Sequence, residues 1–165
     1  MSDEQHVLSI LVEDRPGVLS RIAGLFSGRG FNIESLCVAN AAQEGISRIT
    51  LVTWADSVII EQIIKQLHKL INVVKVNDLT EAPAVFREMA LIKVSAKPEF
   101  RAEILRIVDI FRCKVVDVSA EHYTVEVTGD QGKIAALLDL LKPMGIKEVA
   151  RTGITALSRE NKNGH

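Results

Sequence analysis

The chain has 165 residues, of which 47% are hydrophobic, so it can bury the core of one ordinary domain or of two small ones. Lysine and arginine total 20 against 21 aspartate and glutamate residues, and the formal net charge of −1 gives no global attraction to nucleic acid or to an anionic membrane. Apolar runs stay well short of the roughly 20 residues of a membrane span, and the acidic N-terminus is unlike a secretory signal, so we expect a cytoplasmic protein.

Hydrophobic patterning predicts six elements in the first half of the chain. Residues 6–13 are short and rich in β-branched and aliphatic side chains, which favours a strand, and apolar residues recur at helical spacing after Pro16. Pro16 suits the first helical position because its ring presets φ and its missing N–H would be unpaired there. The later elements are strands over 31–40 and 46–54, a helix over 57–70 and a strand over 73–79.

This order is the ferredoxin-like βαββαβ motif, in which two helices cover one face of a four-stranded antiparallel sheet. The opposite face is then left open, and together with exposed strand edges it favours association into a homodimer. The run Glu81-Ala82-Pro83-Ala84 places a proline among small residues, which is typical of a linker.

The same pattern returns after this break. Strands are predicted over 89–96, 114–119, 123–128 and 146–152, with helices over 98–111 and 131–141. The repetition indicates two related units, so the expected fold class is α+β, with two ferredoxin-like βαββαβ domains in tandem. The run Gly129-Asp130-Gln131-Gly132 has glycines like a phosphate loop, but it precedes a predicted helix, and we interpret it as a helix cap.

A polar site is predicted at the first strand-to-helix turn. The N–H groups of Gly17, Val18 and Leu19 are expected to be unpaired at the positive end of the helix, where a carboxylate would fit. Glycine in a first helical turn costs roughly 1 kcal/mol relative to alanine. Either a tight turn or a ligand that needs the space accounts for Gly17.

Two further polar residues accompany this turn. Asp14 either caps the helix or pairs with a ligand ammonium group. Asn32 lies in an otherwise apolar strand start, where its amide serves either a buried hydrogen bond or a ligand. Together these groups suit a free α-amino acid, with apolar residues nearby to receive an aliphatic side chain.

Known catalytic patterns are absent from the sequence. The four histidines lack metal-ligand spacing, neither cysteine has a local base, and no Walker or Rossmann glycine motif occurs. RNA-binding modules of ferredoxin-like fold stack bases on aromatic side chains, which form only 4% of this chain. We therefore expect no enzyme activity, no metal site and no binding of nucleic acid or membranes.

Six segments carry a resemblance to a known family: Asp14–Leu19, Gly24–Ser27, Arg29–Leu36, Gln66–Leu70, Arg151–Gly153 and Ala156–Arg159. With them the chain resembles, over nearly its whole length, the small regulatory subunit of acetolactate synthase (acetohydroxyacid synthase). The Asp-Arg-Pro-Gly turn alone is similar to ACT domains, which sense amino acids in many proteins, and the other segments are more specific to this family.

The resemblance implies a non-catalytic subunit in branched-chain amino-acid biosynthesis. Such a subunit activates a catalytic large subunit and confers allosteric feedback inhibition by valine bound at the interface of an ACT homodimer. Thiamine diphosphate, FAD and magnesium belong to the large subunit, so no cofactor is expected in this chain. The expected domains are an ACT domain over 1–80, a linker over 81–87, a ferredoxin-like domain over 88–158 and a frayed tail over 159–165.

By the same resemblance, the valine-binding residues are Asp14, Gly17, Val18, Asn32, Ile33 and Ala39. The backbone donors of Gly17 and Val18 would hold the ligand carboxylate, Asp14 and Asn32 would contact its polar groups, and Ile33 and Ala39 would lie nearby. Some relatives carry asparagine at position 14. Two alternatives stay open, a free-standing ACT-type sensor that regulates another biosynthetic enzyme and a small enzyme in its own right.

Overall fold

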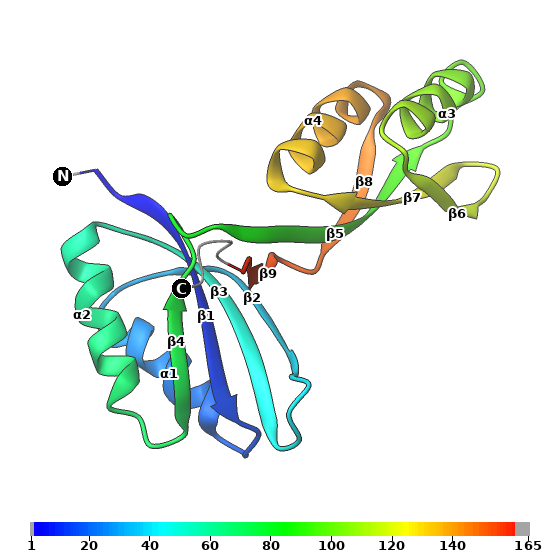
Figure 1. The fold of residues 1–165 in the computed structure, drawn as a ribbon. Coiled ribbons are helices and arrows are strands. Elements are labelled where there is room, and N and C mark those ends of the chain that lie inside the picture. The colour runs from blue at the N-terminus through cyan, green and yellow to red at the C-terminus, as the bar shows by residue number, and fades with distance from the viewer. Residues whose placement is uncertain (1, 161–165) are drawn as a thin grey trace. The chain divides into compact units, whose positions relative to one another are not determined.

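The computed structural model describes residues 2–160 (Figure 1). Most of the predicted tail, residues 161–165, lies outside the described residues. Contacts divide the described chain into two compact units, residues 2–85 with 154–160 and residues 86–153. The chain therefore leaves the first unit at Val85 and returns to it at Ile154.

The first unit is an antiparallel sheet with two helices. Its elements are β1 (Glu4–Glu13), α1 (Val18–Ser27), β2 (Ile33–Asn40), β3 (Ile46–Ala55), α2 (Ser57–His68), β4 (Val73–Asp78) and, after the return of the chain, β9 (Thr155–Ser158). The first four strands form a sheet in the order β2-β3-β1-β4. Within residues 2–160, the two edge strands of this sheet, β2 and β4, are each paired on one side.

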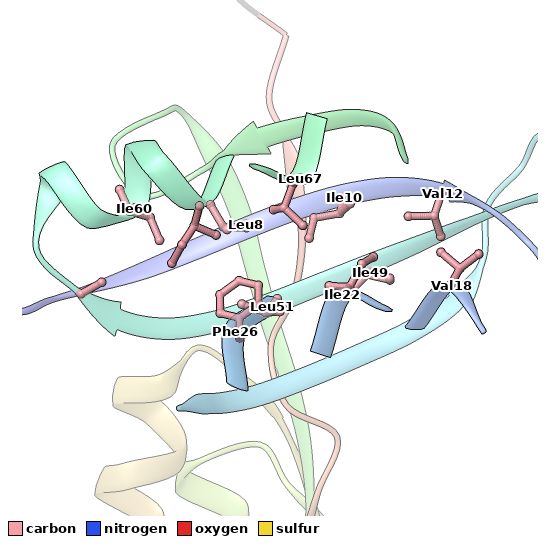
Figure 2. Packing of buried hydrophobic residues seen from close by; sticks show 12 residues of the cluster. Leu8, Ile10, Val12, Val18, Ile22, Phe26, Ile49, Leu51, Ile60 and Leu67 are labelled. Carbon is pink, nitrogen blue, oxygen red and sulfur yellow. The ribbon is translucent and has the colours of Figure 1, made fainter. Parts of the chain in front are cut away.

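Side chains from the sheet and from both helices form the core of this unit (Figure 2). Alternate residues of β1 face the helices because strand side chains have a period of two, and the apolar residues of each helix lie at helical spacing. The buried cluster consists of Leu8, Ile10, Val12, Val18, Ile22, Phe26, Ile49, Leu51, Ala55, Ile60, Ile63 and Leu67.

The opposite face of this sheet is buried over its two central strands, contrary to the prediction of an open face, while Ala39 and Trp54 on the same face are exposed. Val7 and Ser9 on β1 alternate with the core residues, as do Thr50 and Val52 on β3, and none of the four is more than 6% exposed. An open sheet face therefore gives no argument for a dimer. The exposed edge strand β2 remains as the feature that favours pairing.

The second unit repeats the topology of the first. Its elements are β5 (Ala84–Ser95), α3 (Arg101–Ile110), β6 (Lys114–Val118), β7 (His122–Gly129), α4 (Gln131–Leu141), the 3-10 turn η1 (Lys142–Met144) and β8 (Ile146–Arg151). The order β6-β7-β5-β8 corresponds to β2-β3-β1-β4, and β9 pairs with β5 outside that path. The predicted α+β class with two ferredoxin-like βαββαβ units is confirmed.

Several element bounds differ from the predictions. β5 begins at Ala84, inside the segment 81–87 where we predicted a linker, and the four-residue strand β9 was not predicted. The start of α4 is as predicted because Asp130 caps it, with its carboxylate accepting the Lys133 N–H over 2.8 Å. Among the described helices, none has the length and apolarity needed to cross a membrane.

Candidate functional site

The start of α1 differs from the predicted helix start. α1 begins at Val18, and Gly17 occupies the N-cap position with φ of 86°, in the left-handed region. Pro16 therefore belongs to the turn before the helix and is not its first residue. The prediction was wrong because a residue with positive φ does not continue a right-handed helix. Since L-residues rarely adopt this conformation, the turn itself requires glycine at this position.

Open space adjoins Gly17 on its outer side. A Cβ placed on Gly17 would meet no heavy atom within 4 Å beyond its chain neighbours. The backbone conformation thus explains the glycine without a ligand, and the empty space leaves room for one. The two interpretations of Gly17 made from the sequence are compatible.

Three backbone N–H groups at this helix start have no hydrogen-bond partner among residues 2–160, namely those of Gly17, Leu19 and Ser20. The Val18 N–H, predicted to be unpaired, donates instead to the Arg15 carbonyl over a long 3.4 Å. The first turn carries no acidic residue. Unpaired donors and the helix dipole leave this end partly positive, so it suits an anionic group.

Asp14 lies beside these donors without capping the helix. Among residues 2–160 no side chain caps α1, so the structural role considered for Asp14 is not realised. The Asp14 N–H donates to the Gly45 carbonyl over 2.8 Å, and the Glu13 N–H donates to the Asn72 carbonyl over 2.9 Å. These bonds hold the end of β1 between two loops. The Asp14 carboxylate is exposed and has no partner in the described part of the chain, so it remains available to a ligand ammonium group.

Asn32 and Ile33 lie at the other end of α1. β2 begins at Ile33 opposite Thr53, and the Thr53 hydroxyl donates to the Asn32 carbonyl over 2.8 Å. The Asn32 side chain is exposed and makes no hydrogen bond within residues 2–160, so the buried hydrogen bond considered for it is not present. The ten residues of α1 span about 15 Å. One amino-acid ligand therefore cannot contact Gly17 and Asn32 of the same chain.

The remaining two predicted site residues, Val18 and Ala39, do not direct their side chains into the open space beside Gly17. The Val18 side chain is 4% exposed and belongs to the core, which leaves only its backbone to the candidate site (Figure 2). Ala39 pairs with Arg48 on β3, next to the core residue Ile49, so by the strand period Ala39 faces away from the helices. Of the six residues, the structure brings Asp14, Gly17 and the Val18 backbone together.

A polar cluster that the sequence did not suggest adjoins the Asn32–Ile33 end. The Trp54 indole N–H and the Gln5 amide both donate to Oε2 of Glu34, over 2.8 Å and 3.0 Å. The residues come from β3, β1 and β2, and no sequence spacing brings them together. Because Trp54 is half exposed and lies next to Thr53, its fluorescence can report on events at this end of β2.

The second unit lacks a counterpart of the α1 start. At the N-cap of α3, Phe100 has an ordinary right-handed conformation, and Glu103 lies in the first turn. The first turn of α3 therefore carries an acidic residue, paired with Arg106 over 2.7 Å, where the first turn of α1 carries none. Within residues 2–160, no group of three or more histidine, cysteine or acidic residues is placed to hold a metal ion.

Known proteins match the chain along nearly its whole length. Residues 8–75 match the AHAS small subunit-like ACT domain, and residues 87–160 match the family described as the small subunit of acetolactate synthase. The chain is 51% identical to a probable acetolactate synthase small subunit of Archaeoglobus fulgidus, over 96% of this chain and 99% of that protein. It is 53% identical to the acetolactate synthase small subunit of Aquifex aeolicus, over 94% of this chain and 82% of that protein. The crystal structure of the acetolactate synthase small subunit from Thermotoga maritima superposes with a TM-score of 0.87 at 45% identity, covering 96% and 99% of the two chains.

Proposed function

We infer the function of this chain from its family, because it belongs to the small subunits of acetolactate synthase and its N-terminal part is an ACT domain of their type. We propose that it binds the catalytic large subunit, raises the activity of that subunit and makes it sensitive to inhibition by valine. The thiamine diphosphate, FAD and magnesium of the reaction would then be held by the large subunit.

The uncapped start of α1 is the observation that carries the valine site. The unpaired N–H groups of Gly17, Leu19 and Ser20 would receive the valine carboxylate, with the weakly bonded Val18 N–H beside them. Asp14 would accept the ammonium group, since its carboxylate has no other partner in the described chain. This arrangement requires both charged ends of a free amino acid and therefore disfavours peptides and keto acids.

The separation of the predicted residues supports a site shared by two copies. In a two-fold dimer, a contact from one copy to the other occurs twice in reciprocal form. Gly17 of one copy would meet Asn32 and Ile33 of the other, giving two equivalent valine sites. The edge strand β2 offers unpaired backbone groups for this homodimer, and Ala39 on that strand would allow close approach.

Inhibition follows if valine favours one of two states of the assembly. A coupling free energy of about 1–3 kcal/mol is sufficient, provided that valine binds the less active state more tightly. Sensing near roughly 0.1–1 mM valine needs about 4–5.5 kcal/mol of binding free energy. A charge-assisted carboxylate contact and one apolar wall can supply this amount.

Reconstitution tests the proposal directly. Purified large subunit is assayed for acetolactate formation alone, with this chain, and with this chain plus valine, while calorimetry measures valine binding to the isolated chain. We expect activation by the chain, reversal by valine and no turnover by the chain alone. Unchanged large-subunit activity, or turnover by the isolated chain, would contradict the regulatory role.

A further inference from the structure

The chain crosses between its two units twice, at residues 85–86 and at residues 153–154. Hydrogen bonds join the two crossing segments on either side of these points. In the first unit, the Arg159 N–H donates to the Pro83 carbonyl over 2.8 Å. In the second unit, Thr152 bonds to Met89 of the same strand, β5.

Thr152 extends the pairing of β5 and β8 beyond the last residue of β8. Its N–H donates to the Met89 carbonyl over 3.0 Å, and its hydroxyl oxygen accepts the Met89 N–H over 3.1 Å. The hydroxyl proton has two acceptors within reach, the carbonyl of Gly153 at 2.8 Å and that of Met89 at 3.3 Å. The side chain thus acts as a ladder partner for Met89, and its loss would leave the Met89 N–H without that acceptor.

An ion pair lies one residue before this contact on both strands. The Glu88 carboxylate is 3% exposed and accepts from Nε and Nη2 of Arg151, over 2.5 Å and 3.0 Å. Such bidentate pairing fixes geometry as well as charge, and an unpaired carboxylate would be costly to bury. The two crossing strands are therefore held together at consecutive residues.

β1 connects this crossing to the candidate valine site. Its C-terminal end leads into Asp14 and Gly17, and near its N-terminal end Val7 is bonded to the segment that leaves the first unit. The Leu79 N–H donates to the Val7 carbonyl over 2.8 Å, and the Val7 N–H donates to the Thr80 hydroxyl over 3.1 Å. Four residues after Thr80 the chain enters β5 at Ala84, and this strand continues without a break through Met89.

We propose that the paired crossing, held by Thr152 on Met89, carries the valine signal from the first unit to the second. This inference rests on the proposed function and assigns a regulatory role to the C-terminal Arg151-Thr152-Gly153 segment. Thr152 is a positioning residue, because it does not contact valine and acts through β5. Through a single unpaired connection, a displacement of β1 would be absorbed by backbone rotations of that segment. Paired strands move together, so the displacement reaches both crossing points.

Three variants of the full chain, reconstituted with the large subunit, test this role. Thr152→Val keeps the shape of the side chain and removes the hydroxyl, whereas Thr152→Ser keeps the hydroxyl. Thr128→Val is the matched control, because Thr128 is exposed, is opposite Met89 on β7 and makes no side-chain hydrogen bond within residues 2–160. The readouts are activation without valine, the valine concentration for half-inhibition, and valine binding to the isolated subunit by calorimetry.

We expect Thr152→Val to bind valine and activate like the wild type, while its half-inhibitory valine concentration rises at least about fivefold, in line with the loss of a typical allosteric coupling. Thr152→Ser and Thr128→Val should match the wild type. If Thr152→Val does not fold, Glu88→Gln replaces it, since it keeps the side-chain shape and weakens the pairing to Arg151, with the same direction of change expected.

Unchanged valine inhibition in Thr152→Val would overturn the inference, and so would a parallel loss of valine binding or of activation. Equal defects in Thr152→Ser or in Thr128→Val would indicate a general effect on folding and would count against it as well. Failure of the proposed function is distinguishable, because the wild-type subunit itself would then fail to activate the large subunit or to bind valine.

Discussion

The backbone N–H of Asp14 donates to the carbonyl of Gly45 over 2.8 Å, so the turn between β2 and β3 supports the segment that leads into α1. This bond fixes the position of Asp14 while its carboxylate stays exposed. The support for the candidate valine site thus comes from a loop 31 residues away in sequence. A substitution that changes only the Asp14 carboxylate therefore affects ligand binding, whereas a substitution that breaks the bond to Gly45 affects the backbone.

Gly17→Asp should abolish valine inhibition and leave activation of the large subunit intact. The new carboxylate would enter the open space beside the unpaired N–H groups and compete with the carboxylate of valine. The positive φ would cost about 1 kcal/mol of folding free energy. Gly145→Asp in the second unit, also at positive φ, is the control for this strain. Full valine sensitivity in Gly17→Asp would show that valine does not bind at this helix end.

A mixed dimer tests whether two chains share each valine site. Asn32→Ala should weaken valine binding and change the free energy of unfolding by less than about 0.5 kcal/mol, because its side chain is exposed and unpartnered in the described chain. Gly17→Asp and Asn32→Ala homodimers should both lose inhibition. Their heterodimer should regain one intact site and bind about one valine per dimer by calorimetry. No recovery on mixing would indicate that each site lies within one chain.

Phe26→Ala should destabilise the first unit by about 3–5 kcal/mol, because Phe26 is fully buried between α1 and the sheet (Figure 2). Urea denaturation followed by circular dichroism would measure this change. Leu19→Ala on the same helix is the control, since Leu19 is 41% exposed. Equal losses for the two variants would contradict the observed orientation of α1.

Cys113 should react slowly with thiol reagents. Burial raises the pKa of the Cys113 thiol, opposed by the nearby Lys133 charge, and the thiolate is the reactive form. In a Cys37→Ser background, alkylation at pH 8 should be slower than for the same chain in denaturant. Because the folded pKa is raised, this group supports stability below the ordinary thiol pKa, and that contribution is lost as pH rises through the folded pKa. Equal rates in native and denatured chain would contradict this assignment.

Local sequence signals allowed the fold class to be predicted. The errors in the predicted elements occur where contacts between distant parts of the sequence determine the local conformation. The cap at Asp130 is a short-range feature, and it was found from the sequence. The left-handed conformation of Gly17 depends on the direction in which the chain passes from β1 into α1. The spacing of hydrophobic residues carries no information about this direction. β9 has four residues and acquires its identity through pairing with β5, so its own pattern was too short to indicate a strand.

The candidate site was predictable in its residue types and less so in its arrangement. The helix end, Asp14 and Gly17 are sequence neighbours and lie together in the structure. Asn32 is separated from them by the full length of α1, which a linear motif does not reveal. The unpaired donors are also shifted, because the Val18 N–H turns toward Arg15 and the Ser20 N–H is left free among the described residues.

The return of residues 154–160 to the first unit makes the second unit an insertion. During synthesis, the inserted unit leaves the ribosome before the final piece of the unit that surrounds it. Domains usually fold in the order of their synthesis, but here the N-terminal one stays incomplete until residues 154–160 have been synthesised. A nascent chain halted after Gly153 would contain all of the second unit but only part of the first.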